Sequence, residues 1–145
     1  MKNHLRQIID DKQDNLLKRS MVREYLQARV LQGLQESGAF LNWVFHGGTA
    51  LRFLYMIPRY SEDLDFALVR PGAMDNFQAL LGSIQKMFEA ENYTLDVKVK
   101  AVITVKCAFL RFRGLLYELG VSPHGSEVIS VKLEIDTNPP QVKAS

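Results

Sequence analysis

Apolar residues recur at helical spacing in three long stretches of the chain. Over residues 5–17 the pattern is interrupted near residues 10–14, which predicts a broken helix. A second helix is expected to begin at Ser20, its predicted N-cap, and to end before Gly38, a residue suited to the left-handed closing position. A third helix is expected over residues 75–91, after a turn at Pro71 and Gly72.

Other stretches have the pattern of strands. Residues 43–45 form a short apolar run before two glycines, and a short helix is then expected from residue 50 to 54, before Pro58. Residues 63–68 alternate between polar and apolar, so a strand there places Asp63 and Asp65 on one face. Strands are also expected over residues 95–99, 102–112 and 128–135, and residues 138–140 end the last of them.

Composition limits the class of protein without naming a partner. The 145 residues are 47% hydrophobic and 23% charged, as expected of one folded domain. The 18 basic and 16 acidic residues nearly balance, so no large field of one sign attracts nucleic acid. Cys107 is the only cysteine, which excludes an internal disulfide and fits a reducing compartment. No stretch has the pattern of a signal peptide or a membrane span, so we expect a cytoplasmic protein without a membrane partner.

The first candidate for chemistry is the glycine pair Gly47 and Gly48, between a predicted strand and a predicted helix. Glycines allow the backbone to approach a ligand closely, and the free amides of a first helical turn attract phosphate oxygens. Thr49 adds a hydroxyl group at the same place. An ordinary strand-to-helix turn explains the pair equally well, so both interpretations stay open.

The second candidate is the acid pair Asp63 and Asp65. Two carboxylates on one strand face can ligate one or two Mg²⁺ ions through oxygen contacts. A solvated face, or salt bridges to Arg52 or Arg59, explains the same residues without a metal.

The last predicted strand offers a third acid, because Lys132, Glu134 and Asp136 share one of its faces. If this strand lies beside the strand of Asp63, one of the two acids reaches the same metal. The alternative is an exposed face on which Lys132 pairs with Glu134.

Two blocks of sequence together resemble a known family. Residues 45–52 read Phe-His-Gly-Gly-Thr-Ala-Leu-Arg, and residues 59–66 read Arg-Tyr-Ser-Glu-Asp-Leu-Asp-Phe. In this order they resemble the nucleotidyltransferases of the AbiEii/AbiGii toxin type, within the polymerase β-like superfamily. The stretch from Lys132 to Asp136 and the following Asn138-Pro139-Pro140 are similar to the family as well, so the resemblance covers about residues 20 to 140.

The resemblance implies an α/β (α+β) fold, a mixed sheet flanked by helices around a polymerase β-like nucleotidyltransferase core. Length and composition favour one domain over residues 1–145, and the resemblance implies a helical N-terminal part (1–40) and a catalytic core (41–145) within it. It also implies a nucleoside triphosphate substrate, whose distal phosphates Gly47, Gly48 and Thr49 would hold, and Mg²⁺ or Mn²⁺ as cofactor. Asp63 and Asp65 would bind the metal.

By the same resemblance, Asp136 or Glu134 would complete the second metal site and favour deprotonation of the attacking hydroxyl. Arg52, Arg59 and Ser61 are candidates for phosphate contacts, although a structural salt bridge explains either arginine equally well. His46 lies beside the glycines in sequence, and a lone histidine at the end of a strand is more often structural than catalytic.

Five basic residues of the predicted strands either form an edge that receives an RNA acceptor or, more commonly, a solvated face. They are Lys98, Lys100, Lys106, Arg111 and Arg113.

The resemblance therefore predicts a metal-dependent nucleotidyltransferase that modifies an RNA or protein acceptor. It would be the toxin of a toxin–antitoxin or abortive-infection system, with an antitoxin protein as partner. Family members continue into a helical region that supplies a lysine and a further acid, and neither is present in the 145 residues up to Ser145. The alternative is a catalytically weak or inactive nucleotide-binding or regulatory fragment of that family.

Overall fold

A computed structural model describes residues 2–9, 14–46 and 63–139. In this part of the chain, five strands form one mixed sheet in the order β1-β2-β5-β4-β3. The strands are β1 (Trp43–His46), β2 (Asp63–Leu68), β3 (Leu95–Val102), β4 (Val105–Arg113) and β5 (Val128–Asp136). Only β2 and β5 run parallel among these pairs, and the other neighbours are antiparallel. The predicted mixed sheet is confirmed.

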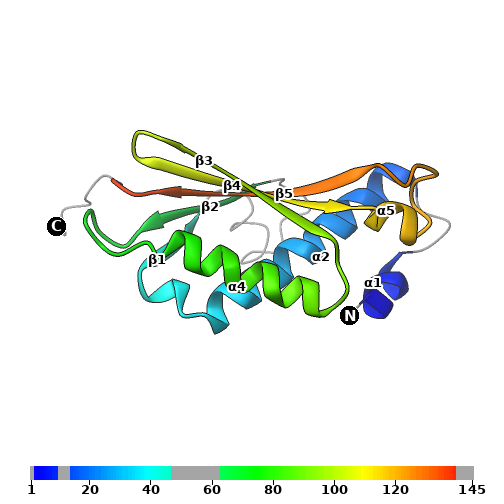
Figure 1. Ribbon diagram of the computed structural model, residues 1–145, viewed down its shortest axis with the longest axis horizontal. Coiled ribbons are helices and arrows are strands. Elements are labelled where there is room, and N and C mark those ends of the chain that lie inside the picture. The colour runs from blue at the N-terminus through cyan, green and yellow to red at the C-terminus, as the bar shows by residue number, and fades with distance from the viewer. Residues whose placement is uncertain (1, 10–13, 47–62, 140–145) are drawn as a thin grey trace.

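The described helices are α1 (Lys2–Ile8), α2 (Asn15–Glu36), α4 (Phe77–Ala90) and α5 (Leu115–Glu118), and a 3-10 turn, η1, covers Ala39–Leu41. Figure 1 shows α2 and α4 side by side along one face of the sheet, with α1 and α5 near one end. The apolar stripes of α2 and α4 face the sheet and are buried, as their helical spacing predicts. The four-residue α5 is too short for periodicity to reveal it.

The predicted start of α2 is wrong. The N-cap is Asp14, whose carboxylate accepts a hydrogen bond from the Leu17 amide at 2.7 Å, and Ser20 lies inside the helix. Aspartate and serine are equally good N-caps, so residue type did not distinguish Asp14 from Ser20. Because Asp14 is the cap, the helix begins more than one turn earlier than predicted. The predicted end is confirmed, because Gly38 has the left-handed φ of +81° just beyond the helix.

The long predicted strand over residues 102–112 is also corrected. Val102 ends β3, and β4 begins at Val105 after a tight turn. Ile103 in that turn is 98% exposed and has a φ of +53°. A β-branched residue is rarely found in this region of backbone space, so the residue types at the turn gave no signal for a hairpin.

One continuous core lies between the sheet and the helices. Alternate residues of β2 and β5 point into it, among them Leu64, Phe66, Leu133 and Ile135. Trp43 of β1 is 2% exposed, and its indole Nε1 donates to the carbonyl of Asp75 at 2.8 Å. Burying each such side chain contributes about 1.5–3 kcal/mol to folding.

The residues that alternate with the core lie on the opposite face of the sheet, which we call the polar face. They are half-buried or exposed, and in β2, β4 and β5 they include carboxylates, cations, Cys107 and Phe109. The core anchors these strands, so the positions of the polar side chains relative to one another are fixed by strand register.

Candidate active site

Strand β2 presents Asp63 and Asp65 on the polar face. Leu64, between the two acids, and Phe66, directly after them, are almost fully buried, with exposures of 0% and 1%. Because side chains alternate along a strand, anchoring the two apolar residues in the core turns both carboxylates the other way. The predicted shared face is confirmed.

Strand β5 lies directly beside β2, as the third-acid hypothesis required. In the parallel register, Asp65 is opposite Glu134, Asp63 is opposite Lys132, and Asp136 is opposite Ala67. Asp136 therefore lies about 7 Å further along the sheet than Glu134. The register brings Glu134, rather than Asp136, next to Asp65.

Asp65 is surrounded by negative charge. Burial raises the pKa of its carboxyl, and the charge of Asp63 and the hydrogen-bonded, negatively charged Glu134 raise it further, whereas the charge of His46 lowers it. His46 ends β1 opposite Asp65. Crowded carboxylates of this kind are relieved by a proton or by a cation.

Two neighbours of these acids had no predicted role in the site. The ammonium group of Lys132 lies 4.0 Å from the carboxylate of Asp63 and 5.9 Å from the ring centre of Phe109. The thiol of Cys107 lies 3.9 Å from Oε1 of Glu134, and its pKa is raised by burial and by the Glu134 charge. Both contacts arise because β5 pairs with β2 and with β4, which are far from one another in sequence. A local sequence motif could therefore not have predicted them.

The donor chemistry fits a divalent cation, because carboxylate oxygens are the preferred ligands of Mg²⁺. Within the described residues, however, no three His, Cys, Asp or Glu side chains already converge on one point that a metal ion could occupy. Lys132 lies against Asp63, and Glu134 lies near Cys107. Binding a metal at Asp63, Asp65 and Glu134 would therefore require these side chains to rotate.

The remaining candidates for phosphate binding lie outside the described residues. They are Gly47, Gly48, Thr49, Arg52, Arg59 and Ser61. Asp136 is described, and its Oδ1 accepts a hydrogen bond from the Asn138 amide at 2.9 Å.

The five predicted basic residues fall into two groups. Lys106 points to the helix side and pairs with Asp75 at 2.7 Å, and Arg113 pairs with Asp96 at 2.7 Å. The other three line one pocket, and they are Lys98, Lys100 and Arg111. The predicted group of five is therefore not a single surface.

Solved structures share this fold. A crystal structure assigned as a nucleotidyltransferase of H. pylori is 25% identical, with a TM-score of 0.56 over 83% of this chain and 46% of its own. The structure of JHP933 from Helicobacter pylori is 23% identical, with a TM-score of 0.57 over 87% of this chain and 47% of its own. The chain thus spans about half the length of each. The fold is that of a nucleotidyltransferase core.

The sequence identifies the family more narrowly. A family model described as "Nucleotidyl transferase AbiEii toxin, Type IV TA system" matches residues 29–145. The chain therefore belongs to the AbiEii nucleotidyltransferase toxin family, as its two motif blocks predicted. No curated protein is significantly similar to it in sequence. Among the described helices, none has the length and apolar character needed to cross a membrane.

Proposed function

We propose that this chain is the catalytic core of a metal-dependent nucleotidyltransferase. It moves a nucleotide from a nucleoside triphosphate to an RNA or protein acceptor, and it is the toxin of a toxin–antitoxin system with an antitoxin protein as partner. The observation that supports the chemistry is the crowding of Asp63, Asp65 and Glu134 on adjacent parallel strands, which raises the pKa of Asp65. Such crowding is expected where a cation normally binds.

In this proposal, Asp63 and Asp65 hold Mg²⁺ or Mn²⁺, and Glu134 is the third carboxylate. Asp136 is the less suitable choice because it lies opposite Ala67 and already accepts the Asn138 amide. When bound, the cation neutralises charge on the phosphate oxygens of the substrate. Gly47, Gly48 and Thr49 contact the distal phosphates, with Arg52, Arg59 and Ser61 as further phosphate ligands.

The transfer is a displacement at the α-phosphorus. The hydroxyl oxygen of the acceptor forms a bond to that phosphorus, the bond from it to the bridging oxygen of the β-phosphate breaks, and pyrophosphate leaves. The proton of the hydroxyl passes to the carboxylate of Glu134. Most of the rate enhancement comes from positioning and from charge neutralisation, since little covalent chemistry falls to the protein.

A second candidate is a nucleotide-binding or regulatory module without turnover. The contact between Lys132 and Asp63 favours it, because that cation already neutralises part of the charge that a metal would neutralise. This candidate predicts binding of triphosphate without transfer.

The test is transfer of radiolabelled nucleotide by the wild type and by an Asp63→Asn, Asp65→Asn double variant. Each is supplied with Mg²⁺ or Mn²⁺, all four nucleoside triphosphates, total RNA and total protein. The double variant should lose transfer by on the order of a hundredfold or more, since it removes the charges that hold the metal. Calorimetry should show a parallel loss of Mn²⁺ affinity.

The matched control is Glu89→Gln, which neutralises an exposed acid on α4, away from the polar face. It should leave both transfer and Mn²⁺ binding unchanged. Equal Mn²⁺ affinity in the wild type and the double variant would show that the metal assignment is wrong. Triphosphate binding without transfer by the wild type would favour the regulatory module.

A further inference from the structure

A pocket of about 220 Å³ opens on the polar face, beside the carboxylates but separate from them. It is lined by residues of three strands: Lys98 and Lys100 of β3, Phe109 and Arg111 of β4, and Ser130 of β5. The hairpin of β3 and β4 and its antiparallel pairing with β5 bring these residues together. None of them belongs to the two motif blocks of the family resemblance.

The pocket carries positive charge that the described part of the chain does not neutralise. There, Lys98, Lys100 and Arg111 make no ion pair, in contrast to Lys106 and Arg113. The carboxylate of Asp96 is opposite Arg111 in the register, but the guanidinium of Arg113 lies 2.7 Å from it. Three like charges gathered around one pocket attract anions, so the pocket is suited to an anionic ligand.

An aromatic ring lies among these cations. Phe109 is half-buried, with Lys98 opposite it on β3 and Lys132 opposite it on β5. The ammonium group of Lys132 is 5.9 Å from the ring centre. Proteins bind single-stranded nucleic acids through aromatic rings surrounded by cations, because bases stack on the ring while phosphates contact the cations. The carboxylates of an acidic protein surface would pair with the cations but would make no favourable contact with the electron-rich face of the ring.

Strand register places this pocket next to the acids. Lys98, Phe109, Lys132 and Asp63 form one line of neighbours across β3, β4, β5 and β2. With strands about 4.8 Å apart, Phe109 lies roughly 10 Å from Asp63. Along β5, Ser130 and Glu134 share the same face, so the pocket and the third carboxylate are parts of one surface.

We propose that this pocket binds the single-stranded 3′ end of a nucleic-acid acceptor. Lys98, Lys100 and Arg111 contact its phosphates, a base stacks on Phe109, and the terminal hydroxyl extends along β5 toward Glu134. The acceptor role rests on the proposed transferase function, whereas binding of the nucleic acid does not.

The experiment measures binding of a fluorescein-labelled single-stranded RNA by anisotropy, over a range of NaCl concentrations. Binding is measured in EDTA and without triphosphate, so it does not depend on catalysis. The charge variant is Lys98→Gln with Arg111→Gln, and the ring variant is Phe109→Leu. The matched control, Arg70→Gln with Lys86→Gln, removes the same charge from exposed residues outside the pocket.

The charge variant should bind RNA about tenfold or more weakly. Its slope of log affinity against log salt should become smaller by about 1.4, which is about 0.7 for each of the two phosphates that it no longer neutralises. The ring variant should bind about tenfold more weakly with an unchanged slope, because stacking releases no counterions. The control should match the wild type in both quantities. Affinity for nucleoside triphosphate should be the same in all four proteins.

Several outcomes would overturn the proposal. RNA binding equal to wild type in the charge variant would show that the pocket is not the site. Binding of polyglutamate by a wild-type chain that does not bind RNA would assign the pocket to an acidic protein. Triphosphate affinity reduced in step with RNA affinity would assign it to the donor nucleotide. If the pocket variants lose RNA binding and the wild type transfers no nucleotide, the pocket is supported and only the transferase proposal fails.

Discussion

At the scale of single residues, the candidate site depends on which acid of β5 lies beside Asp65. Glu134 and Asp136 share a strand face, and both belong to the stretch that resembles the family. The register of β5 against β2 distinguishes them, because it places Glu134 opposite Asp65 and Asp136 opposite Ala67.

We therefore expect Glu134→Gln to lower the rate of nucleotide transfer by about a hundredfold or more, as the loss of a positioned carboxylate commonly does. Asp136→Asn serves as the matched variant and should remain close to the wild-type rate. Transfer rates at saturating Mg²⁺ and triphosphate decide between them. If Asp136→Asn is the more damaging change, the third carboxylate is Asp136.

At the scale of elements, the fit between α2 and α4 depends on Gly33. A Cβ at Gly33 would lie 2.5 Å from Cδ1 of Ile84 and 3.1 Å from Sδ of Met87, both on α4. Ile84 is 1% exposed, so its side chain has little room to move. Gly82, within α4, has nothing within 4 Å of the position of an added Cβ.

The two glycines should consequently respond in opposite ways to alanine. Gly82→Ala should raise the free energy of unfolding by about 0.5–1 kcal/mol, because alanine favours the helix. Gly33→Ala should lower it, since overpacking costs about 1–3 kcal/mol and exceeds the same helical gain. Urea unfolding followed by circular dichroism measures both. A stabilised Gly33→Ala variant would mean that α4 can shift away from α2 at little cost.

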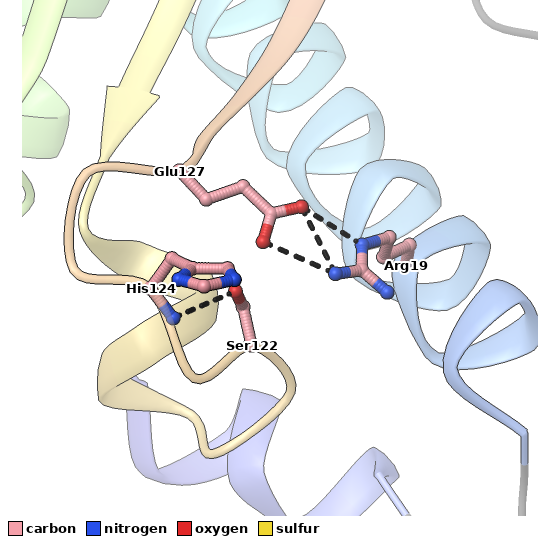
Figure 2. A network of polar contacts seen from close by, with 4 residues as sticks. All are labelled: Arg19, Ser122, His124 and Glu127. Carbon is pink, nitrogen blue, oxygen red and sulfur yellow. Dashed lines mark hydrogen bonds and ion pairs between the residues drawn. The ribbon is translucent and has the colours of Figure 1, made fainter.

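At the scale of the whole molecule, a polar network joins the start of α2 to the loop before β5. Figure 2 shows Arg19 of α2 facing Glu127. The two side chains form a forked pair, with an Arg19 Nη2 to Glu127 Oε1 distance of 2.9 Å and an Arg19 Nε to Glu127 Oε1 distance of 3.1 Å. A hydrogen bond from Ser122 and the contacts with Arg19 hold the pKa of Glu127 below its usual range.

A lowered carboxyl pKa stabilises the fold only while the carboxyl is ionised. The contribution of Glu127 is present above the ordinary glutamate pKa of about 4.3 and is lost as pH falls through its lower value in the folded state. Glu127→Gln should therefore have a modestly lower Tm than the wild type at pH 7. The difference should shrink as pH falls below the ordinary glutamate pKa and disappear only below the lower pKa of the folded state, where the Glu127 carboxyl is protonated in the folded and the unfolded chain alike.

Thermal unfolding at a series of pH values measures this effect. Glu89→Gln, which removes an exposed acid on α4, should show no such pH-dependent difference. A gap between the Glu127→Gln variant and the wild type that persists unchanged at low pH would mean that the charge of Glu127 is not what links α2 to this loop.

The sequence by itself determined the periodic elements and the family. Periods of 3.6 and 2 predicted α2, α4, β2, β3 and β5, because the face that is buried repeats with the geometry of each element. The same period placed Asp63 with Asp65, and Glu134 with Asp136. Local signals failed where two residues compete for one role, as with Asp14 and Ser20, and where a turn such as that at Ile103 carries no glycine or proline.

Only the tertiary structure decided which separated residues meet. Strand order and register bring Glu134 to Asp65, Lys132 to Asp63 and Phe109 to Lys98. They also divide five basic residues into two ion pairs and one cationic pocket. The physical reason is that a shift of one residue in register turns every side chain of a strand to the other face. The packing of the whole core selects the observed strand register. The sequence of a single strand therefore does not determine which residues of other strands lie opposite it.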